Sequence, residues 1–346
     1  MKSMAQLEYH YGLKVRIYPS DRQKKLIKLN SDASRFVYNE MVAIGKELWQ
    51  LKQVKLPIDT VQDRIKQLEL RQNAKQLSNH FQFLEDKRID SLAKANAIRN
   101  YRKAWKAFRK VHSTGVPKFH RKSYAWGYQT NCQYIQQKTA QLTNGTVCFE
   151  DCQHVLVPKL GRLRIKGSHK RLLNRKAETR IGTVTITKDA ADRFFLSMQL
   201  GSDTPFMTKP AKTNRQTGID LNTENFLTTS DGKVVANPRY YRTIRGRLAK
   251  EQRVLSRRAR RAKKEHRPLR NSKNYQKQRL LVAKIHAQVL DRRKNFLHCG
   301  FVMGTEGTDK LTLADREWNC PKCQTHHVRD HNAAQNILIK GIAKLA

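Results

Sequence analysis

The C-terminal stretch from Cys299 to Leu338 constrains the fold of this chain more than any other part of the sequence. It contains the pair Cys320-Pro-Lys-Cys323, whose spacing places two thiolates on one tight turn, and Cys299 lies upstream of this pair. Thiolates in this pattern are typical ligands of tetrahedral zinc, which needs four donors. Phe296 stands where a C-x-x-C partner of Cys299 would be, so the cysteine set is incomplete. Zinc is a candidate cofactor, and the fourth ligand would be water or one of three histidines: His298, His326 and His327.

The segment after the cysteine pair is expected to begin a helix at Arg329, which places Asp330 at the helix start. A carboxylate in this position is stabilised by the positive end of the helix dipole. Asp330 can therefore be a simple N-cap or a functional carboxylate, and the helix pattern alone favours neither.

The charge of the chain indicates what kind of partner it binds. Its 346 residues include 70 Lys and Arg against 28 Asp and Glu, which gives a formal net charge of +42. An excess of this size predicts a polyanionic partner. Scaffolding proteins that bind nucleic acid are equally basic, so charge alone leaves a binding module and an enzyme both open.

Cysteine use and hydropathy indicate the compartment. The chain has six cysteines, and Cys132, Cys148 and Cys152 are scattered through apparent strands, which suits a reducing cytoplasm better than a disulfide framework. The sequence has no apolar run long enough for a membrane span and no signal-peptide core at its N-terminus. We therefore expect a cytoplasmic, nucleoid-associated protein without a membrane partner.

The N-terminal part predicts one strand followed by helices. Leu13, Val15 and Ile17 alternate with polar residues, which is typical of a half-buried strand. Two apolar stripes with helical spacing follow. They consist of Val37, Met41, Ile44 and Leu48, and of Ile98, Tyr101, Trp105 and Phe108. We expect the aromatics of the second stripe to pack in a core rather than to stack on bases.

Basic residues lie on the other faces of the second predicted helix. Arg99 and Lys103 are among them, and they are candidates for contacting phosphates, although such charges are equally compatible with a solvated surface.

From Gly115 onward, short strands and turns replace the helical spacing. Asn144-Gly145 is expected to separate two strands, and residues 184–187 are expected to pair with residues 196–200 in a hairpin. These alternations predict a small antiparallel barrel that the strand near Leu13 completes. Basic turn residues are candidates for binding nucleic acid, with solvated surface charge as the alternative: Lys118, Arg121, Lys122, Lys166, Lys170 and Arg171.

A carboxylate on a strand opens the last part of the chain. Ile219 and Leu221 flank Asp220, so a strand here presents the carboxylate on one face and apolar side chains on the other. The Asp231-Gly232 turn is expected to lead this strand into a second one at Val234-Val235. Without further information Asp220 is more easily explained as structural than as a metal ligand.

Two very basic helices are predicted next, over residues 242–264 and 279–298, and Pro268 separates them. The second carries Val282, Ile285 and Val289 on one side. So many guanidinium groups in the first helix favour a nucleic-acid backbone as partner. The residues proposed for this contact are Arg245, Arg247, Arg257, Arg258, Arg260 and Arg261.

Several of these strings together resemble one known family. They are LTLADREWNCPKC and RDHNAAQNIL near the C-terminus, GIDL with the SDG turn, and RIYP with RFVYN near the N-terminus. They are similar to TnpB proteins, which are transposon-encoded RNA-guided nucleases related to type V CRISPR effectors. The resemblance spans most of the chain, and its C-terminal string is specific.

The resemblance implies an α+β multidomain architecture. A wedge-type antiparallel β-barrel would comprise residues 1–20 and 114–208, with a helical recognition lobe, residues 21–113, inserted into it. A ribonuclease-H-like domain of the RuvC type would follow over residues 209–298, then a degenerate zinc-ribbon insertion at 299–328 and a C-terminal helix at 329–346. The implied partners are a guide RNA and a double-stranded DNA target with an adjacent motif.

The carboxylates implied by the resemblance are not all present. RuvC-type cleavage uses two divalent ions, usually magnesium, held by three carboxylates. Asp220 would be the first and Asp330 the last, but in TnpB proteins a glutamate at the end of a hydrophobic strand supplies the middle one. Here the predicted helix runs directly into Cys299, and that segment is missing. Between Gly232 and Cys299 the acidic residues are Glu251, Glu265 and Asp291, which lie in basic helical sequence and are poorly placed to replace it. Glu306 lies in the loop of the zinc ribbon and is also poorly placed.

We therefore predict that Asp220 and Asp330 are vestigial, that cleavage is lost and that magnesium is not required. The chain resembles nuclease-dead TnpB-like proteins that repress transcription by occupying DNA. An active endonuclease completed by Glu306 or another carboxylate is the second hypothesis. The third is a decayed transposon remnant that binds only RNA. The missing strand would also leave an edge of the sheet uncovered. The sequence leaves the oligomeric state open.

Overall fold

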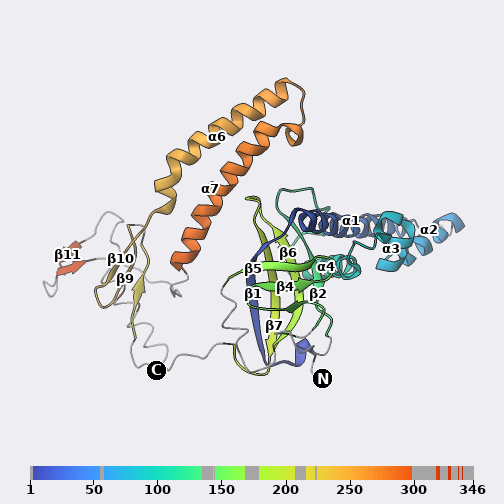
Figure 1. Cartoon of the computed structure of the whole chain (residues 1–346), viewed down its shortest axis with the longest axis horizontal. Coiled ribbons are helices and arrows are strands. Elements are labelled where there is room, and N and C mark those ends of the chain that lie inside the picture. The colour runs from blue at the N-terminus through green and yellow to red at the C-terminus, as the bar shows by residue number, and fades with distance from the viewer. Residues whose placement is uncertain are drawn as a thin grey trace. The chain divides into compact units, whose positions relative to one another are not determined.

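The protein, described here from a computed structural model, has two compact units, Met1–Thr208 and Lys209–Ala346. The structure describes residues 3–54, 58–111, 113–134, 143, 145–167, 179–206, 216–222, 224–297, 317–319, 326–328, 334 and 337. Figure 1 labels most of their helices and strands. Sheet and helix both occur in each unit, so the chain is an α+β multidomain protein. Within these residues, none of the helices combines the length and the apolar character that a membrane span needs.

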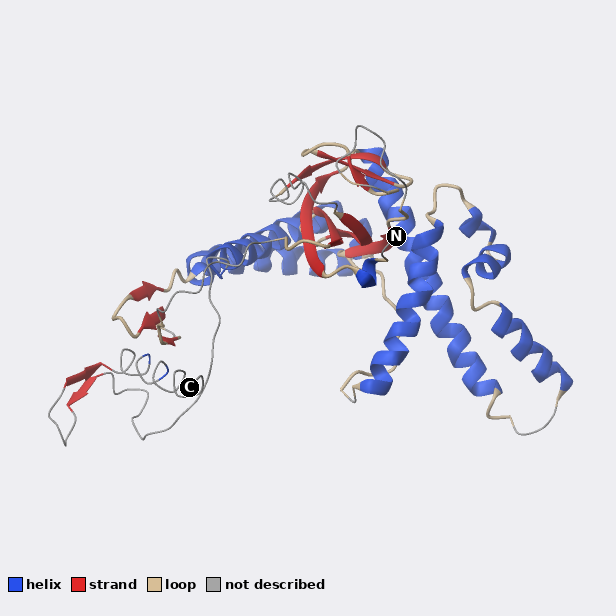
Figure 2. Cartoon of the chain, turned by 90° about the horizontal axis from the view of Figure 1, so that it is seen from below, coloured by secondary structure: helices blue, strands red, loops and turns tan. Residues whose placement is uncertain are grey.

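The first unit contains a seven-stranded antiparallel sheet that is strongly curved (Figure 2). Its strand order is β2-β6-β7-β1-β5-β4-β3. The strands are β1 (Tyr9–Tyr18), β2 (Trp126–Asn131), β3 (Cys148–Phe149), β4 (His154–Val157), β5 (Gly161–Lys166), β6 (Arg180–Lys188) and β7 (Phe194–Ser202).

The alternation in the sequence sets which face of this sheet is buried. Leu13, Val15 and Ile17 on β1 point into the core and are 6%, 1% and 1% exposed. Strand β1 pairs antiparallel with β7 on one side and with β5 on the other. The predicted hairpin is confirmed, because β6 pairs with β7 and places Ile186 opposite Leu196. Both of these side chains are fully buried in the same core.

The two ends of the sheet are joined by hydrogen bonds just beyond the edge strands. After β2, the Gln133 carbonyl accepts a bond from the Thr146 N–H at 2.8 Å, and the Gln133 N–H donates to Thr146 Oγ1 at 2.9 Å. Gly145 precedes this contact with a φ of +119°, and a Cβ there would collide with Cys132 Sγ. A glycine is therefore required where the turn was expected, although Asn144 lies outside the described residues.

Four α-helices accompany the sheet. Ser20 caps the first by accepting a hydrogen bond from the Gln23 N–H, and Asp90 caps the fourth through the Leu92 N–H. The helices are α1 (Asp21–Leu51), α2 (Asp59–Leu70), α3 (Ala74–His80) and α4 (Ser91–Lys110), with short 3-10 turns at Met4–Gln6 and Gln82–Glu85.

The two predicted apolar stripes pack differently. The stripe on α1 is fully buried, and its four residues lie in one core cluster with Ile98 of α4. The rest of the stripe on α4 is only half-buried, with Tyr101, Trp105 and Phe108 in edge-to-face contact with one another. Core packing thus explains the start of this stripe and accounts only partly for its end.

A buried polar contact joins the helices to the sheet. Asn30 on α1 is fully buried and accepts a hydrogen bond from the Asp90 N–H at 2.7 Å. Asp90 in turn accepts a bond from Thr130 Oγ1 on β2 at 2.5 Å. Because buried polar groups are costly when unpaired, this chain of bonds fixes how α1, α4 and β2 meet.

The second unit begins with a three-stranded sheet in the order β10-β9-β8. Two long helices follow, and the 3-10 turn Leu269–Asn271 comes after Pro268 between them. The elements are β8 (Ile219–Asp220), β9 (Asn225–Thr229), β10 (Val234–Ala236), α6 (Tyr240–Lys264), α7 (Lys273–Leu297), β11 (Glu317–Asn319) and β12 (His326–Val328).

The predicted direct connection from the Asp220 strand through the Asp231-Gly232 turn to Val234-Val235 was wrong. Asp220 pairs with Thr228 of β9, and the Asp231-Gly232 turn joins β9 to β10. The chain already reverses direction right after β8, where the Asn225 N–H donates to Asn222 Oδ1 at 2.7 Å. An asparagine turn of this kind was not recognised in the sequence, so the intervening strand was missed.

The two basic helices pack on each other along their apolar sides. Val282, Ile285 and Val289 of α7 form a small core with Ile244 and Leu248 of α6, as the spacing predicted for α7. Gln278 Nε2 donates to Glu251 at 2.6 Å and adds a polar contact between the same helices.

Leu196→Ala should destabilise the first unit by about 2–5 kcal/mol, because it leaves a cavity in a fully buried position. Urea unfolding followed by tryptophan fluorescence measures this change. Leu70→Ala is the matched control, since Leu70 is 66% exposed, and it should change stability by less than about 0.5 kcal/mol. Equal effects of the two substitutions would contradict the core described here.

Candidate nucleic-acid interface

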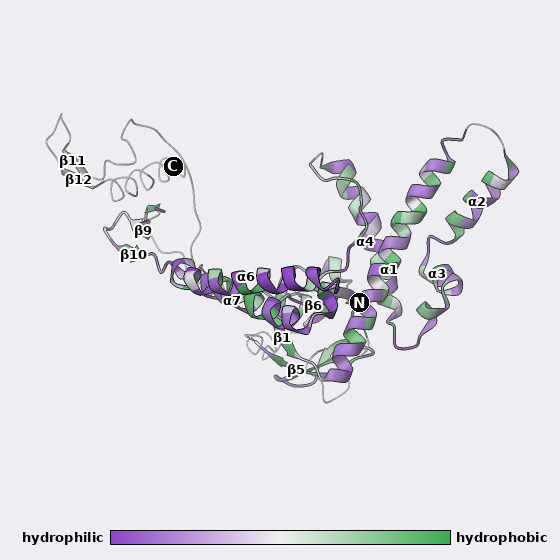
Figure 3. Ribbon diagram, turned by 90° about the horizontal axis from the view of Figure 1, so that it is seen from above, coloured by the Kyte–Doolittle hydropathy of each residue, from purple (hydrophilic) through white to green (hydrophobic). Residues whose placement is uncertain are grey.

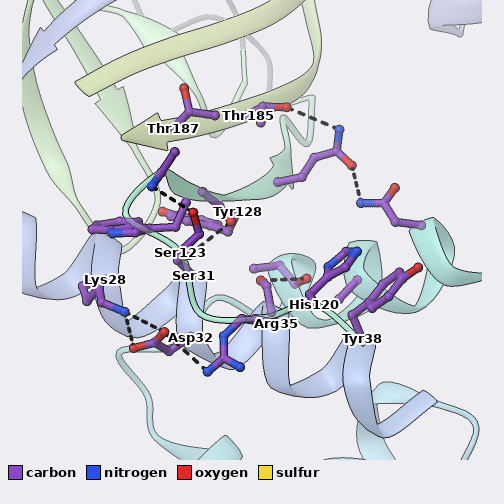
Figure 4. Close-up of a pocket in the computed structure, with 18 of the residues that line it drawn as sticks. Lys28, Ser31, Asp32, Arg35, Tyr38, His120, Ser123, Tyr128, Thr185 and Thr187 are labelled. Carbon is purple, nitrogen blue, oxygen red and sulfur yellow. Dashed lines mark hydrogen bonds and ion pairs between the residues drawn. The ribbon is translucent and has the colours of Figure 1, made fainter. Parts of the chain in front are cut away.

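A cavity of about 440 Å³ lies in the first unit between helices α1 and α4 and the outer side of strands β2 and β6 (Figure 4). Its size is in the range of pockets that hold small molecules or single nucleotides. The residues that line it and matter below are Lys28, Asp32, Arg35, Tyr38, Asn100, His120, Arg121, Lys122, Gln129, Thr185 and Thr187.

One wall of the cavity is the extended segment that leads from α4 to β2. Asn39 of α1 holds it in place, because its amide nitrogen donates to the His120 carbonyl at 3.1 Å and its oxygen accepts from the His120 N–H at 2.7 Å. The His120 ring stacks on Tyr38 with centroids 3.9 Å apart and planes within 7°. Lys46 Nζ also lies over the Phe119 ring at 4.6 Å. The segment is therefore fixed at both backbone and side chain.

This segment presents three of the predicted nucleic-acid-binding residues. Arg121 and Lys122 line the cavity, and Lys118 lies three residues before Arg121 on the same exposed segment. Because Asn39 fixes the segment, these cations are held at a defined place rather than on a free loop.

The α1 side of the cavity is also positively charged. Lys28 Nζ is 2.6 Å from Asp32 and Arg35 Nη2 is 3.8 Å from the same carboxylate, so two cations share one anion. Arg35 Nε is buried and has no hydrogen-bond partner among the described residues. An unpaired buried donor beside exposed cations favours an anionic ligand at this place.

The opposite wall carries a chain of amide groups that can read a base edge. Asn100 Nδ2 donates to Gln129 Oε1 at 3.1 Å, and Gln129 Nε2 donates to Thr185 Oγ1 at 3.3 Å. Each amide has two N–H donors, and these bonds occupy one on each side chain. Asn and Gln side chains are typical readers of base edges.

Two more predicted residues of the first unit lie on α4. Arg99 is exposed and donates to Asn96 Oδ1, which is buried, so part of its hydrogen-bonding capacity is used inside the protein. Lys103 is exposed one turn further along the helix. Lys166 is exposed at the end of β5, and Lys170 and Arg171 lie outside the described residues.

Helix α6 of the second unit carries the remaining predicted cations, and Figure 3 shows it largely hydrophilic with narrow apolar bands. Arg258 differs from the others because its Nη1 donates to the Asn274 carbonyl at 2.7 Å, so it joins α6 to the start of α7. Arg257 and Arg260 border a shallow hollow of about 700 Å³ on one side of α6. The exposed members of the predicted set are Arg245, Arg247, Arg257, Arg260 and Arg261.

Asp220 is half-buried on the short strand β8. Over the described ranges, the structure contains no group of three or more His, Cys, Asp or Glu residues that could hold a metal ion. A two-metal site needs several carboxylates around one point, and of the two predicted ligands the structure describes Asp220. Asp330 and the three cysteines, Cys299, Cys320 and Cys323, lie outside the described residues.

Sequence reasoning did not find the cavity. Its key contacts join Asn39 to His120 and Asn100 to Gln129, and these pairs are far apart in the chain. The only signal was the string RFVYN, which includes Arg35, Tyr38 and Asn39, but nothing in its spacing indicated what these residues would contact.

Asn39→Ala should release the segment between α4 and β2, because it removes both hydrogen bonds to the His120 backbone. We expect faster amide hydrogen exchange at residues 118–122 and a loss of about 1–3 kcal/mol of stability. Asn73→Ala, which also removes side-chain hydrogen bonds but at the start of α3, is the control and should leave exchange in this segment unchanged.

Folding lowers the pKa of His120, because partial burial and the nearby Arg35 guanidinium disfavour the imidazolium. As the pH falls below about 6.5, the unfolded chain takes up this proton first, so the free energy of unfolding decreases. Between about pH 7.5 and pH 5.5, His120→Gln should therefore lose less stability than the wild type. His10→Gln, at an exposed position, is the control. The same pH dependence in wild type and His120→Gln would contradict this assignment.

Three family models match parts of the chain. Residues 183–299 match a model described as "Probable transposase", residues 9–53 a "Helix-turn-helix domain" and residues 293–337 a "Cas12f1-like, TNB domain". In this chain the second match contains strand β1 and the whole of α1, so residues 9–53 hold one helix rather than two. The first and third matches overlap at residues 293–299, so no unmatched segment separates them.

Two relatives match most of the chain. A protein of Streptomyces pristinaespiralis, provisionally named as an RNA-guided DNA endonuclease, is 27% identical over 401 residues and covers 97% of this chain and 90% of its own length. The Escherichia coli K12 protein InsQ, with the same provisional name, is 21% identical over 287 residues. That match covers 83% of this chain and 61% of InsQ.

The longer match also reveals a difference in length. It extends over 401 residues, 55 more than the 346 of this chain, so the Streptomyces protein has at least that many residues opposite gaps here. The matched models, the relatives and the motifs at both ends of the sequence agree, and the chain belongs to the TnpB family.

Proposed function

We propose that this protein is a guide-RNA-directed DNA-binding protein that has lost nuclease activity and represses transcription by occupying its target. The observation that carries the proposal is the position of the carboxylates expected at a metal site. Asp220 lies on β8, but no metal-binding group is formed around it by the residues that the structure describes.

Three lines support binding to nucleic acid. Both relatives are named for RNA guidance and DNA, and the net charge of +42 calls for a polyanionic partner. The cavity between α1, α4 and β2 combines cations with amide groups that suit a base edge. We assign it, with Lys118, Arg121 and Lys122, to the motif beside the target. The seven-stranded sheet would act as the wedge barrel that holds the guide, and Arg99 and Lys103 would contact the duplex.

Loss of cutting is supported by where the acidic residues of the second unit lie. Glu251 is bonded to Gln278 between α6 and α7, and Glu265 pairs with Arg261 and Arg267 at the end of α6. Asp291 lies on α7. All three residues lie in or directly after basic helices, whereas in TnpB proteins the middle carboxylate ends a hydrophobic strand.

The length difference from the Streptomyces relative supports the same conclusion. At least 55 residues of that protein have no counterpart here, and the two C-terminal family matches overlap where the missing strand and helix would be. We infer that the lesion is a deletion from a RuvC-like domain, and that Asp220 and Asp330 remain as vestiges. Magnesium would then have no catalytic role.

The cysteines are assigned to a structural rather than a catalytic metal. Cys299, Cys320 and Cys323 would hold zinc in a degenerate ribbon, with a histidine or water as the fourth ligand. We also propose a cytoplasmic, nucleoid-associated location, which follows from the function.

The protein co-expressed with its RNA should bind a plasmid that contains the matching target and leave it supercoiled in the presence of Mg²⁺. Asp220→Ala should bind the plasmid as the wild type does, because no cleavage depends on that carboxylate. Gel electrophoresis and a mobility shift measure both results. Asp231→Ala, in an exposed turn of the same sheet, is the control. Strand breaks that Asp220→Ala abolishes and Asp231→Ala does not would contradict the loss of nuclease activity.

A further inference from the structure

The outer face of strands β1 and β7 gathers positive charge around one aromatic ring. Lys14 Nζ lies 4.6 Å from the centroid of Phe195, and the guanidinium carbons of Arg16 and Arg193 lie 5.6 and 5.5 Å from it. Arg16 also lies 5.5 Å from the Tyr18 ring. We call these residues, together with Lys166 of β5, the Phe195 cluster.

The pairing of the strands fixes this arrangement. Arg16 is opposite Phe195 on β7 and opposite Lys166 on β5, so a row of three side chains crosses three strands. Lys14 and Tyr18 are two residues before and after Arg16 and therefore share its face. None of these residues lines the cavity described above.

The cluster is electrostatically unfavourable in the free protein. Like charges directly opposite each other on neighbouring strands destabilise a sheet, and Arg16 faces Lys166 in this way. Asp189 lies 2.7 Å from Arg193 Nε and offsets part of the charge. Arg16 Nε is buried and lacks a hydrogen-bond partner in the part of the chain that the structure describes. An anion with several acceptor oxygens would satisfy this donor and relieve the repulsion.

The aromatic side chains indicate which anion fits. Tyr18 is 47% exposed, with Arg16 near its ring. An exposed ring on a sheet, flanked by Lys and Arg, is a platform on which an unpaired base stacks while its phosphates contact the cations. A paired duplex cannot offer a base in this way, so single-stranded nucleic acid is favoured.

We propose that the Phe195 cluster is a binding site for single-stranded nucleic acid, with phosphates on Lys14, Arg16 and Lys166 and a base on Tyr18. The proposal rests on the proposed function only in that both require a nucleic-acid partner. It gives the sheet a defined contact surface on β1, β5 and β7, which is separate from the cavity assigned to the motif beside the target.

The test uses the full chain, freed of RNA by a high-salt wash, and fluorescence anisotropy with labelled RNA and DNA strands of one sequence, about 16 nucleotides long. Lys14→Gln/Arg16→Gln/Lys166→Gln should weaken binding at least about tenfold. The slope of log affinity against log salt should fall by about 2, because each lost phosphate contact contributes about 0.7. Whether RNA or DNA loses more affinity identifies which strand occupies the site.

The matched control removes the same charge elsewhere in the first unit. Lys66→Gln/Lys75→Gln/Lys87→Gln alters three exposed lysines near or on α2 and α3 and should change the slope little. Equal losses for both triple variants would show diffuse attraction and overturn the site. Tyr18→Leu should weaken binding about 5- to 100-fold at high salt as well, whereas Tyr18→Trp should retain affinity.

Two further results separate this site from structural effects and from the proposed function. Thermal melting of the cluster triple variant should show an unchanged or higher Tm, because a repulsive pair is removed; a clear fall would indicate a structural role and overturn the site. If the cluster triple variant binds oligonucleotides as the wild type does and occupies matching DNA normally, the proposed site alone is overturned. If the wild type does not bind guide-matched DNA but its oligonucleotide binding still depends on the Phe195 cluster, the proposed function alone is contradicted.

Discussion

The antiparallel pairing of β1 with β7 and β5 is the interaction on which the first unit depends. Strand β1 comes from the N-terminus, yet it lies in the middle of a sheet whose other strands all follow α4 in sequence. Its inward residues Leu13, Val15 and Ile17 complete the core. Its outward residues Lys14 and Arg16 create the charge that we assign to nucleic acid. One strand therefore links the stability of the sheet to its surface chemistry, through the two-residue period of its side chains.

Charge shapes the second unit in a similar way. Helices α6 and α7 meet through a small apolar core and present most of their Arg and Lys side chains outward. Glu251 is bonded to Gln278 between the two helices, and Glu265 pairs with Arg261 at the end of α6. Repulsion among the Arg and Lys cations disfavours the packed helices, and a bound polyanion would reduce that repulsion. These cations suit the polyanionic partner that the net charge of +42 also favours.

The sequence predicted local elements well where one periodicity ran through a segment. Strand β1, helix α1, the β6–β7 hairpin and the packing face of α7 all followed from apolar spacing. The prediction from sequence failed at Asp220, because an asparagine turn places β9 between β8 and the Asp231-Gly232 turn that had been recognised. The Asn39–His120 contact and the row from Lys166 to Phe195 depend on the order and register of strands, which no local pattern encodes. Asp330 and the cysteines of the predicted zinc site lie outside the described residues, and their assignments stay predictions.

The central claim is that this protein still binds DNA under the direction of a guide RNA but no longer cuts it. Mapping where the protein lies on the chromosome, together with sequencing the RNA that co-purifies with it, tests this claim most directly. The account predicts a small number of discrete sites, each complementary to the bound RNA, with intact DNA at every one. Scattered occupancy without any match to the RNA, or matched sites that carry strand breaks, would contradict it.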